Sequence, residues 1–327
     1  MRVLALTFGD EHQASSKYRV FQLIEPVAKL GIQIEPVPAN VFKNWNEVRR
    51  YDAVLIQKKL FRSGRVRQLR RSTPHLIYDI DDAIWHPHGK EHSFFTNLRN
   101  RWRLKAVARA ADVCICANNV LAEHMRQMTD RVTIVPLALD GNRWHKKGEI
   151  ESSAVVRVGW SGHPVNLPYL EAIEPALVQV QLENPNVEFA VFCGKAPAFR
   201  KLKYRHIRFQ PDTEVEAVSS FDIGILPLPP GPFAAGKSPI KGLQYMAIGI
   251  PTVLTPMEAT REMSREGETA LFASTNEEWQ RAINTLVRDS AARARMGTRA
   301  RAVFESTYEL ARIVPLLAKA LSPIRRA

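Results

Sequence analysis

A glycine-containing loop followed by a short helix carries the residues best suited to chemistry. Gly236 lets the backbone approach a ligand closely, and Lys237 follows it directly. Ser238 and Pro239 are typical of an N-cap and a first helical residue. One turn on, Lys241 adds a second ammonium group beside the free N–H groups at the positive end of the helix. This combination predicts an anion site, best suited to a phosphate.

The segments on either side of this loop predict how it is held. A strand over Asp222–Leu228 leads into it, the helix runs to Ile248 and stops at Gly249, and a second strand covers Ile250–Thr255. The whole segment, GKSPIKGLQYMAIGIPTVLTP, resembles the donor-binding segment of the group 1 glycosyltransferases. The alternative is the strand–loop–helix of any parallel sheet, with lysines that face solvent.

The resemblance implies both a fold and an activity. The fold is α/β of the GT-B kind, with two Rossmann-like, doubly wound parallel-sheet domains facing a cleft. The activity is transfer of a sugar, with retention, from a nucleotide sugar to a saccharide, lipid-linked or other acceptor in cell-envelope or polysaccharide synthesis. The alternation of strands and helices along the chain favours the same fold class.

Further segments match the family in the expected order along the chain. They are SSKYRV at 15–20, YDIDDAIW at 78–85, IVPLALD with Trp144, VGWSGHP at 158–164, and GETALFA with Glu262 upstream. In family members the VGWSGHP position is a glycine turn near the donor phosphates. The resemblance therefore implies phosphate contacts from Ser161, Gly162 and His163, although His163 is equally a surface histidine beside a proline.

The chain departs from the family at two positions. Family members commonly carry two glutamates eight residues apart, one near the sugar hydroxyls and one near the nucleotide ribose. Gly236 and Gln244 stand at these positions. The amide of Gln244 can still bind a ribose, whereas Gly236 has no side chain, so the transferred sugar stays open.

The lysines of the loop fit the charge that such a reaction develops. A leaving diphosphate gains negative charge, which Lys237, Lys241 and the helix N-terminus would stabilise without a metal. We therefore expect no cofactor and no metal ion. Lys237 is assigned a catalytic role, whereas Lys241 is equally a solvated helix lysine.

Three aspartates follow a strand predicted at His75–Asp82. Asp79 and Asp81 form a D-x-D string, which holds a metal in another, single-domain class of glycosyltransferases. At the carboxyl end of a parallel strand, Asp81 and Asp82 would face the cleft and position the acceptor hydroxyl. The alternative interpretation is a pair of helix-capping aspartates.

Length and composition predict two domains and a small tail. A chain of 327 residues with an apolar share of 45% is long enough for two full cores. We expect an acceptor-side domain over 1–145, a donor-binding domain over 153–308, and a helix over 309–327 that packs back on the first domain. Neither a secretory signal nor an apolar run of about 18 residues is present, and three cysteines without metal spacing indicate a cytoplasmic protein.

The positive charge is concentrated in the first half of the chain. Residues 1–150 hold 25 lysines and arginines against 15 aspartates and glutamates, which indicates an anionic partner. A protein that binds nucleic acid through this half is therefore one alternative function, although no helix-turn-helix or RNP-like string supports it. A GT-B-like nucleotide-sugar epimerase is another. The chain has no G-x-G-x-x-G, P-loop, H-E-x-x-H or G-x-S-x-G motif.

Residues 85–105 combine aromatic and basic side chains. They are Trp85, Phe94, Phe95 and Trp102 with Lys90, Arg99, Arg101, Arg103 and Lys105. Such a set suits the headgroup zone of an anionic membrane and predicts peripheral association with the inner face of the cell membrane. The alternative is an ordinary helix whose arginines extend over the domain core.

Overall fold

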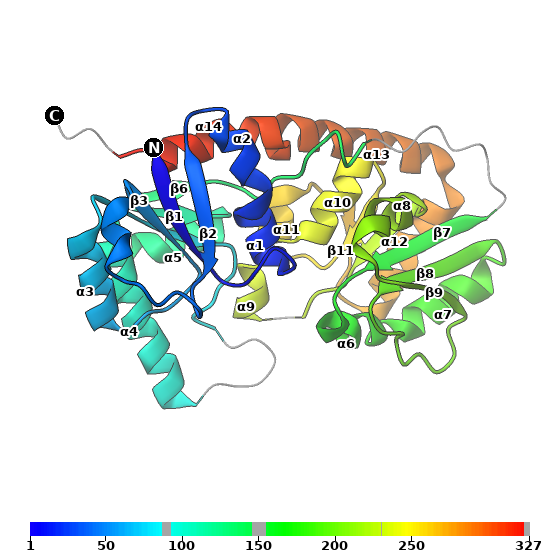
Figure 1. Ribbon diagram of the computed structural model, residues 1–327. Helices are drawn as coiled ribbons and strands as arrows, with labels where there is room; N and C mark the ends of the chain where they lie inside the picture. Colours follow the sequence, from blue (N-terminus) through cyan, green and yellow to red (C-terminus); the bar gives the residue numbers. More distant parts are fainter. Residues whose placement is uncertain (87–92, 146–154, 230, 324–327) are drawn as a thin grey trace. The chain divides into compact units, whose positions relative to one another are not determined.

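The chain divides into two compact units, each built on its own sheet (Figure 1). The computed structural model describes residues 1–86, 93–145, 155–229 and 231–323. Unit 1 comprises Met1–Ala138, Gly231–Ser238 and Leu310–Ala327, and unit 2 comprises Leu139–Pro230 and Pro239–Glu309. The expected domain ranges differ from these units mainly at residues 231–238, which pack with unit 1 although the surrounding sequence belongs to unit 2.

Unit 1 contains a six-stranded parallel sheet in the order β2-β1-β3-β4-β5-β6. Its strands are β1 (Arg2–Thr7), β2 (Gln33–Pro38), β3 (Ala53–Gln57), β4 (His75–Ile80), β5 (Val113–Cys116) and β6 (Val132–Ile134). Because all strands are parallel, their carboxyl ends meet at one edge of the sheet, which is where ligands bind in such folds.

Helices cover both faces of this sheet. They are α1 (Ala14–Arg19), α2 (Ile24–Ala28), α3 (Ser63–Ser72), α4 (Phe94–Ala110), α5 (Asn119–Arg126), α9 (Pro232–Ala235) and α14 (Leu310–Leu321). In β1, Leu4 and Leu6 pack into the core formed with α3, α4 and α5. The alternate residues, Val3 and Ala5, pack into a second core with α2 and α14, as the two-residue period of a strand requires.

Unit 2 repeats the plan with the strand order β12-β11-β10-β7-β8-β9, again parallel. Its strands are β7 (Val156–Ser161), β8 (Val187–Cys193), β9 (Tyr204–Arg208), β10 (Ile223–Leu226), β11 (Thr252–Leu254) and β12 (Ala270–Phe272). Its helices are α6 (Leu167–Glu171), α7 (Glu174–Glu183), α8 (Glu214–Ser219), α10 (Ile240–Ile248), α11 (Glu258–Met263), α12 (Asn276–Arg288) and α13 (Ser290–Val303). The predicted fold class, two doubly wound α/β domains, is confirmed.

The loop before α10 differs from the sequence-based expectation. The predicted end of the helix is confirmed, since it stops at Gly249, which has a φ of +76°. The predicted cap is wrong: α10 begins at Ile240 with Pro239 at its N-cap and no side-chain cap. The hydroxyl of Ser238 instead accepts a hydrogen bond from the side-chain amide of Asn118 at 3.3 Å, so contact with another element of unit 1 replaces the local cap.

Two findings bear on the expected compartment. Among the described helices, none is both long and apolar enough to cross a membrane. The three cysteines, Cys114, Cys116 and Cys193, are free thiols buried in their sheets. The predicted linker at 141–152 lies outside the described residues from residue 146 onward.

Candidate functional site

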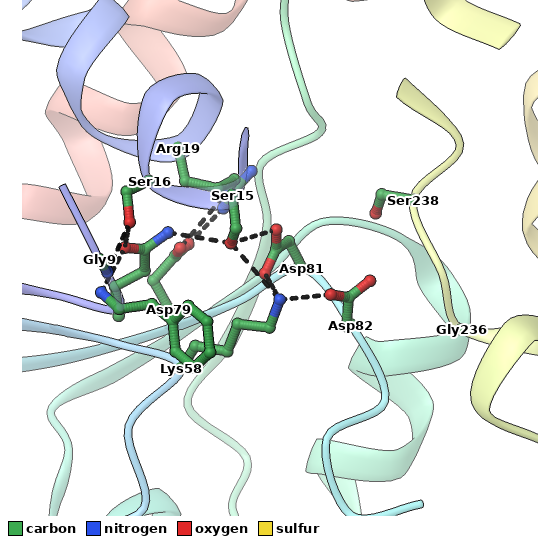
Figure 2. A network of polar contacts seen from close by, with 12 residues as sticks. Gly9, Ser15, Ser16, Arg19, Lys58, Asp79, Asp81, Asp82, Gly236 and Ser238 are labelled. Atoms are coloured by element: carbon green, nitrogen blue, oxygen red, sulfur yellow. Dashed lines mark hydrogen bonds and ion pairs between the residues drawn. The ribbon is translucent and has the colours of Figure 1, made fainter. Parts of the chain in front are cut away.

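Charged side chains gather at the carboxyl ends of β3 and β4 in unit 1 (Figure 2). Lys58 follows the last residue of β3, and Asp81 and Asp82 follow the last residue of β4. The ammonium of Lys58 lies 3.1 Å from Oδ1 of Asp81 and also pairs with Oδ2 of Asp82. The predicted position of both aspartates at the end of a parallel strand is therefore correct.

Lys58 holds this arrangement with an unusual backbone conformation. Its φ of +62° makes it the one non-glycine residue of the described chain with a positive φ. A side chain in that conformation costs on the order of 1–3 kcal/mol. Burial works to lower the pKa of Lys58, but the carboxylates of Asp81 and Asp82 outweigh it and the pKa is raised. The side chain is thus a permanent cation fixed between two carboxylates.

Asp81 is buried, and its carboxylate makes a hydrogen bond and an ion pair. Its Oδ2 accepts a hydrogen bond from the hydroxyl of Ser15, at 2.6 Å, and its Oδ1 contacts Lys58. Burial opposes ionisation of this carboxyl, but Lys58 and Ser15 outweigh burial and hold its pKa below the usual value. Neither aspartate caps a described helix, because the next helix in the described part of the chain, α4, starts at Phe94 and is capped by Ser93.

Asp82 is the accessible carboxylate of the group. Its side chain is 21% exposed, against 8% for Asp81. One of its oxygens, Oδ2, pairs with Lys58, whereas Oδ1 has no hydrogen-bond partner among the residues that the structure describes. Asp82 therefore presents a carboxylate oxygen that can accept a hydrogen bond from a ligand hydroxyl.

A buried ion pair supports the cluster from within unit 1. The guanidinium of Arg19 donates to both carboxylate oxygens of Asp79, with Nε 3.1 Å from Oδ2, and to the carbonyl oxygen of Val135 at 2.6 Å. Asp79 and Asp81 both lie on the α1 side of β4, where Arg19 and Lys58 neutralise them. Each aspartate of the D-x-D string is therefore paired with a cation of the chain.

The loop at 231–238 packs against this edge of unit 1. The side-chain amide of Asn118 donates a hydrogen bond to the carbonyl oxygen of Gly236 at 3.1 Å. The backbone N–H of Ser238 donates one to the backbone carbonyl oxygen of Asp81 at 3.4 Å. A Cβ at Gly236 would lie 3.0 Å from side-chain atoms of Ala83 and Leu121. A side chain at position 236, such as the family's glutamate, would therefore need Ala83 and Leu121 to move by a few tenths of an ångström.

Lys237 brings a further cation to the same place. No hydrogen bond or ion pair involves its side chain within the described residues. Burial lowers its pKa, the charge of Lys58 adds to this, and the charge of Asp82 opposes it. Since two carboxylates are already shared by Lys58, the ammonium of Lys237 is the one in this cluster available to an incoming anion.

In unit 2, Ser161 ends the first strand, β7, and Gly162 and His163 follow it as predicted, but the N–H groups of Ser161 and Gly162 are occupied. The N–H of Ser161 donates to the hydroxyl of Tyr245 at 2.9 Å, and the N–H of Gly162 to the carbonyl oxygen of Phe192 at 3.2 Å. A Cβ at Gly162 would lie 2.3 Å from the ring of Trp160, so packing also requires this glycine. The hydroxyl of Ser161 is buried without a partner in the described chain, and His163 is exposed.

Lys241 and Gln244 share one carboxylate partner in unit 2. The ammonium of Lys241 lies 2.9 Å from Oε1 of Glu214, and the amide of Gln244 donates to the same oxygen at 3.0 Å. Glu214 is 3% exposed and Gln244 is fully buried. Lys241 is therefore not the solvated lysine of the alternative interpretation, and its charge is offset before any ligand arrives.

Four residues of these clusters were not predicted from the sequence: Lys58, Ser15, Arg19 and Glu214. Lys58 had one available signal, because it follows the end of a strand, β3, directly. The segments SSKYRV and YDIDDAIW were both singled out by resemblance, and the structure joins them through Ser15 and Arg19. No local pattern could have paired Glu214 with Lys241, because the contact depends on how α8 packs against α10.

The predicted site residues fall into two groups. Gly236, Lys237 and Ser238 lie with Asp81 and Asp82 in unit 1, and Ser161, Gly162, His163, Lys241 and Gln244 lie in unit 2. Over the described ranges, no three histidine, cysteine, aspartate or glutamate side chains come together as metal ligands. Whether activity is independent of metal stays a prediction.

Comparison with known proteins agrees with this architecture. Residues 166–289 match the family model described as "Glycosyl transferases group 1". The search of curated proteins gave no match. Among solved structures, HepE from Anabaena in complex with UDP matches with a TM-score of 0.74 and 14% identity, covering 99% of this chain and 100% of that one.

Two further structures match over nearly the same length. Sucrose-phosphate synthase from Thermosynechococcus elongatus has a TM-score of 0.72 at 13% identity and covers 97% of both chains. A glycosyltransferase from Rickettsia africae has a TM-score of 0.69 at 10% identity, covering 97% of this chain and 96% of that one. The chain therefore has the GT-B fold along its length. Residues 166–289 match the group 1 glycosyltransferase domain, and this range lies in unit 2 except for residues 231–238 of unit 1. The match confirms the resemblance and supports a transferase.

Proposed function

We propose that the protein transfers a sugar from a nucleotide sugar to a hydroxyl group of a saccharide or lipid-linked acceptor. The observation that carries the proposal is Lys237. It lies inside the segment that matches the group 1 model, and no described residue pairs with its ammonium. A cation held ready for an anion suits a diphosphate leaving group, whose negative charge grows as the bond to the sugar breaks.

The residues of unit 1 supply the acceptor side of the proposed reaction. The acceptor oxygen forms a bond to the sugar carbon while the bond from that carbon to the diphosphate oxygen breaks, and the proton of the acceptor hydroxyl passes to the leaving diphosphate oxygen. The accessible Oδ1 of Asp82 is the group that we assign to hold this hydroxyl. Asp81 acts through Lys58, which both carboxylates share, and is a positioning residue.

The residues of unit 2 supply donor contacts. The buried hydroxyl of Ser161 is the group that we assign to a donor oxygen, since the N–H groups of Ser161 and Gly162 are taken. Lys241 and Gln244 act together with Glu214, so a bound nucleotide meets a carboxylate, an ammonium and an amide. A carboxylate suits ribose hydroxyls, so we assign Glu214 to the proposed ribose contact together with Gln244.

The choice of first donor follows from the neighbours. Structures of HepE contain UDP or UDP-glucose, so UDP-glucose is the donor to test first. Retention of the anomeric configuration and a role in envelope or polysaccharide synthesis rest on the family resemblance alone. We also propose a cytoplasmic location, supported by the three free, buried cysteines.

Turnover of UDP-sugars tests the proposal. The purified protein is expected to release UDP from one member of a panel of UDP-, GDP- and ADP-sugars, slowly into water and faster with an acceptor saccharide. Excess EDTA is expected to leave the rate unchanged, because lysine and helix N–H groups offset the diphosphate charge. Activity that EDTA abolishes and manganese restores would contradict the metal-free proposal. Interconversion of the donor sugar without UDP release would identify an epimerase instead.

A further inference from the structure

The first half of α4 exposes a cluster of large apolar side chains, which we call the α4 tip. Phe94, Phe95 and Trp102 are 74%, 79% and 65% exposed, and Leu98 is 43% exposed. Phe94, Leu98 and Trp102 follow at intervals of four residues and therefore form one continuous stripe along the helix. An exposed stripe of this kind on a folded domain marks an interaction surface.

Basic side chains accompany the stripe without any acidic partner. Helix α4 has no acidic residue, and its basic residues are Arg99, Arg101, Arg103, Lys105 and Arg109. None of these five takes part in an ion pair within the described parts of the chain. Burial lowers the pKa of Arg103, and the positive charges of Arg99 and Arg62 lower it further. The surface therefore carries uncompensated positive charge.

The helix presents the aromatic and the basic side chains to solvent together. Its buried face consists of Leu104, Val107 and Ala108. At 100° per residue, Lys105 projects between Phe94 and Leu98, and Arg101 projects about 20° from Phe94 and about 20° from the buried Ala108; both basic side chains are exposed. The alternative interpretation of this segment, arginines extended over the domain core, stays a prediction, because Arg101 also lines a hollow with Leu104 and His124.

The N-terminal end of the α4 tip is apolar, and its later part mixes aromatic and basic side chains. Phe94 and Phe95 precede Arg99 by about 6–8 Å along the helix axis at 1.5 Å per residue, whereas Trp102 lies between Arg101 and Arg103. In Figure 1 the N-terminal end of α4 extends beyond the neighbouring α3 of the same unit. An interfacial segment buries its apolar groups about 5–10 Å below the headgroups. The lead of Phe94 and Phe95 over the first basic residue lies within that depth.

We propose that the α4 tip docks the protein on an anionic membrane surface. Phe94, Phe95, Leu98 and Trp102 enter the boundary between headgroups and acyl chains, and the basic residues from Arg99 onward contact lipid phosphates. Charge complementarity selects this occupant, because a lipid phosphate surface supplies the negative charge that α4 lacks. The proposal is independent of the donor site. Of the residues predicted for this surface, Lys90 lies outside the described residues.

Vesicle co-sedimentation of the full chain tests the docking surface. At low ionic strength, the protein is expected to pellet with vesicles of phosphatidylcholine and phosphatidylglycerol and to stay in solution with phosphatidylcholine alone. The variant Phe94→Ser/Phe95→Ser/Trp102→Ser is expected to lose binding at least tenfold. Arg101→Gln/Lys105→Gln is expected to lose about 25-fold, since each basic residue near the surface contributes about fivefold.

Matched controls separate docking from general changes in the protein. Leu30→Ser/Val41→Ser removes exposed apolar groups elsewhere in unit 1, at 53% and 56% exposure, and is expected to bind as the wild type does. The α4 variants should keep UDP release in solution. Three results would overturn the proposal: wild type that remains in the supernatant, equal binding to both vesicle types, or a dimer in solution that the triple serine variant abolishes.

Discussion

Replacing Lys237 with alanine is expected to remove nearly all donor turnover while leaving the melting temperature of the free protein almost unchanged. The side chain makes no described hydrogen bond or ion pair that folding would lose. Its ammonium acts on the leaving diphosphate, and loss of one such group costs about 2.7–4 kcal/mol, or about 10²–10³ in rate. The rate of UDP release from the preferred donor measures the loss of turnover. A thermal melt of the free protein measures whether its melting temperature has changed.

Two further variants make this result specific. Lys29→Ala removes an exposed lysine that pairs only with Glu25, one turn away, and should leave turnover unchanged. Lys237→Arg keeps the charge with a different shape and should restore part of the rate. Full turnover in Lys237→Ala would contradict the assignment. A large fall in its melting temperature would show that the lysine has a structural role.

Lys58→Met is expected to destabilise the protein strongly. It leaves Asp81 buried and Asp82 partly buried without their shared cation. Removing one partner of a buried ion pair costs about 3–5 kcal/mol. Methionine has a Cβ as lysine does, so the substitution does not relieve the cost of the positive φ at position 58. Urea unfolding of the variant and the wild type measures the difference.

The pH dependence of the stability difference between Lys58→Met and the wild type tests whether the lost ion pair causes it. In the folded wild type the pKa of Asp81 is held below its usual value. The ionised carboxylate therefore stabilises the folded state at pH values above the pKa that Asp81 has in the unfolded chain. This stabilisation is lost as the pH falls through the pKa of Asp81 in the folded protein. Without Lys58, burial raises that pKa instead. The stability deficit of Lys58→Met should therefore shrink from neutral pH to about pH 4, where carboxyls take up protons.

A double variant provides the control for this prediction. In Lys58→Met/Asp81→Asn the buried position carries no charge, so part of the lost stability should return. If the deficit is the same at both pH values and the double variant is no more stable than Lys58→Met, the effect comes from packing and the ion-pair interpretation is wrong.

The sequence predicted the fold well because its signals are local and repeated. Alternating strands and helices define both sheets, and the end of α10 follows from Gly249, whose positive φ is a property of that one position. The start of the same helix was predicted incorrectly, because Asn118, far away in the sequence, contacts Ser238 and supersedes the local cap.

The site was predicted in part for the same physical reason. Position at a strand end placed Asp81 and Asp82 correctly, since carboxyl ends of parallel strands meet at one edge. Their partners could not be predicted, because Lys58 and Ser15 reach them only through the packing of β3 and α1 against β4. Similarly, Lys241 has the sequence of a surface lysine, and only the fold of unit 2 brings Glu214 to it.

Nucleotide-dependent melting tests the central claim most directly, because it requires neither an acceptor nor turnover. A ligand at about 100 times its Kd stabilises the folded state by about 2.7 kcal/mol, which corresponds to a rise of about 5–10 °C in Tm for units of this size. We expect such a rise with one nucleoside diphosphate and its sugars, UDP and UDP-glucose being the first to test, and a much smaller rise for Lys237→Ala. An unchanged Tm with every nucleotide and nucleotide sugar in the panel would contradict the account.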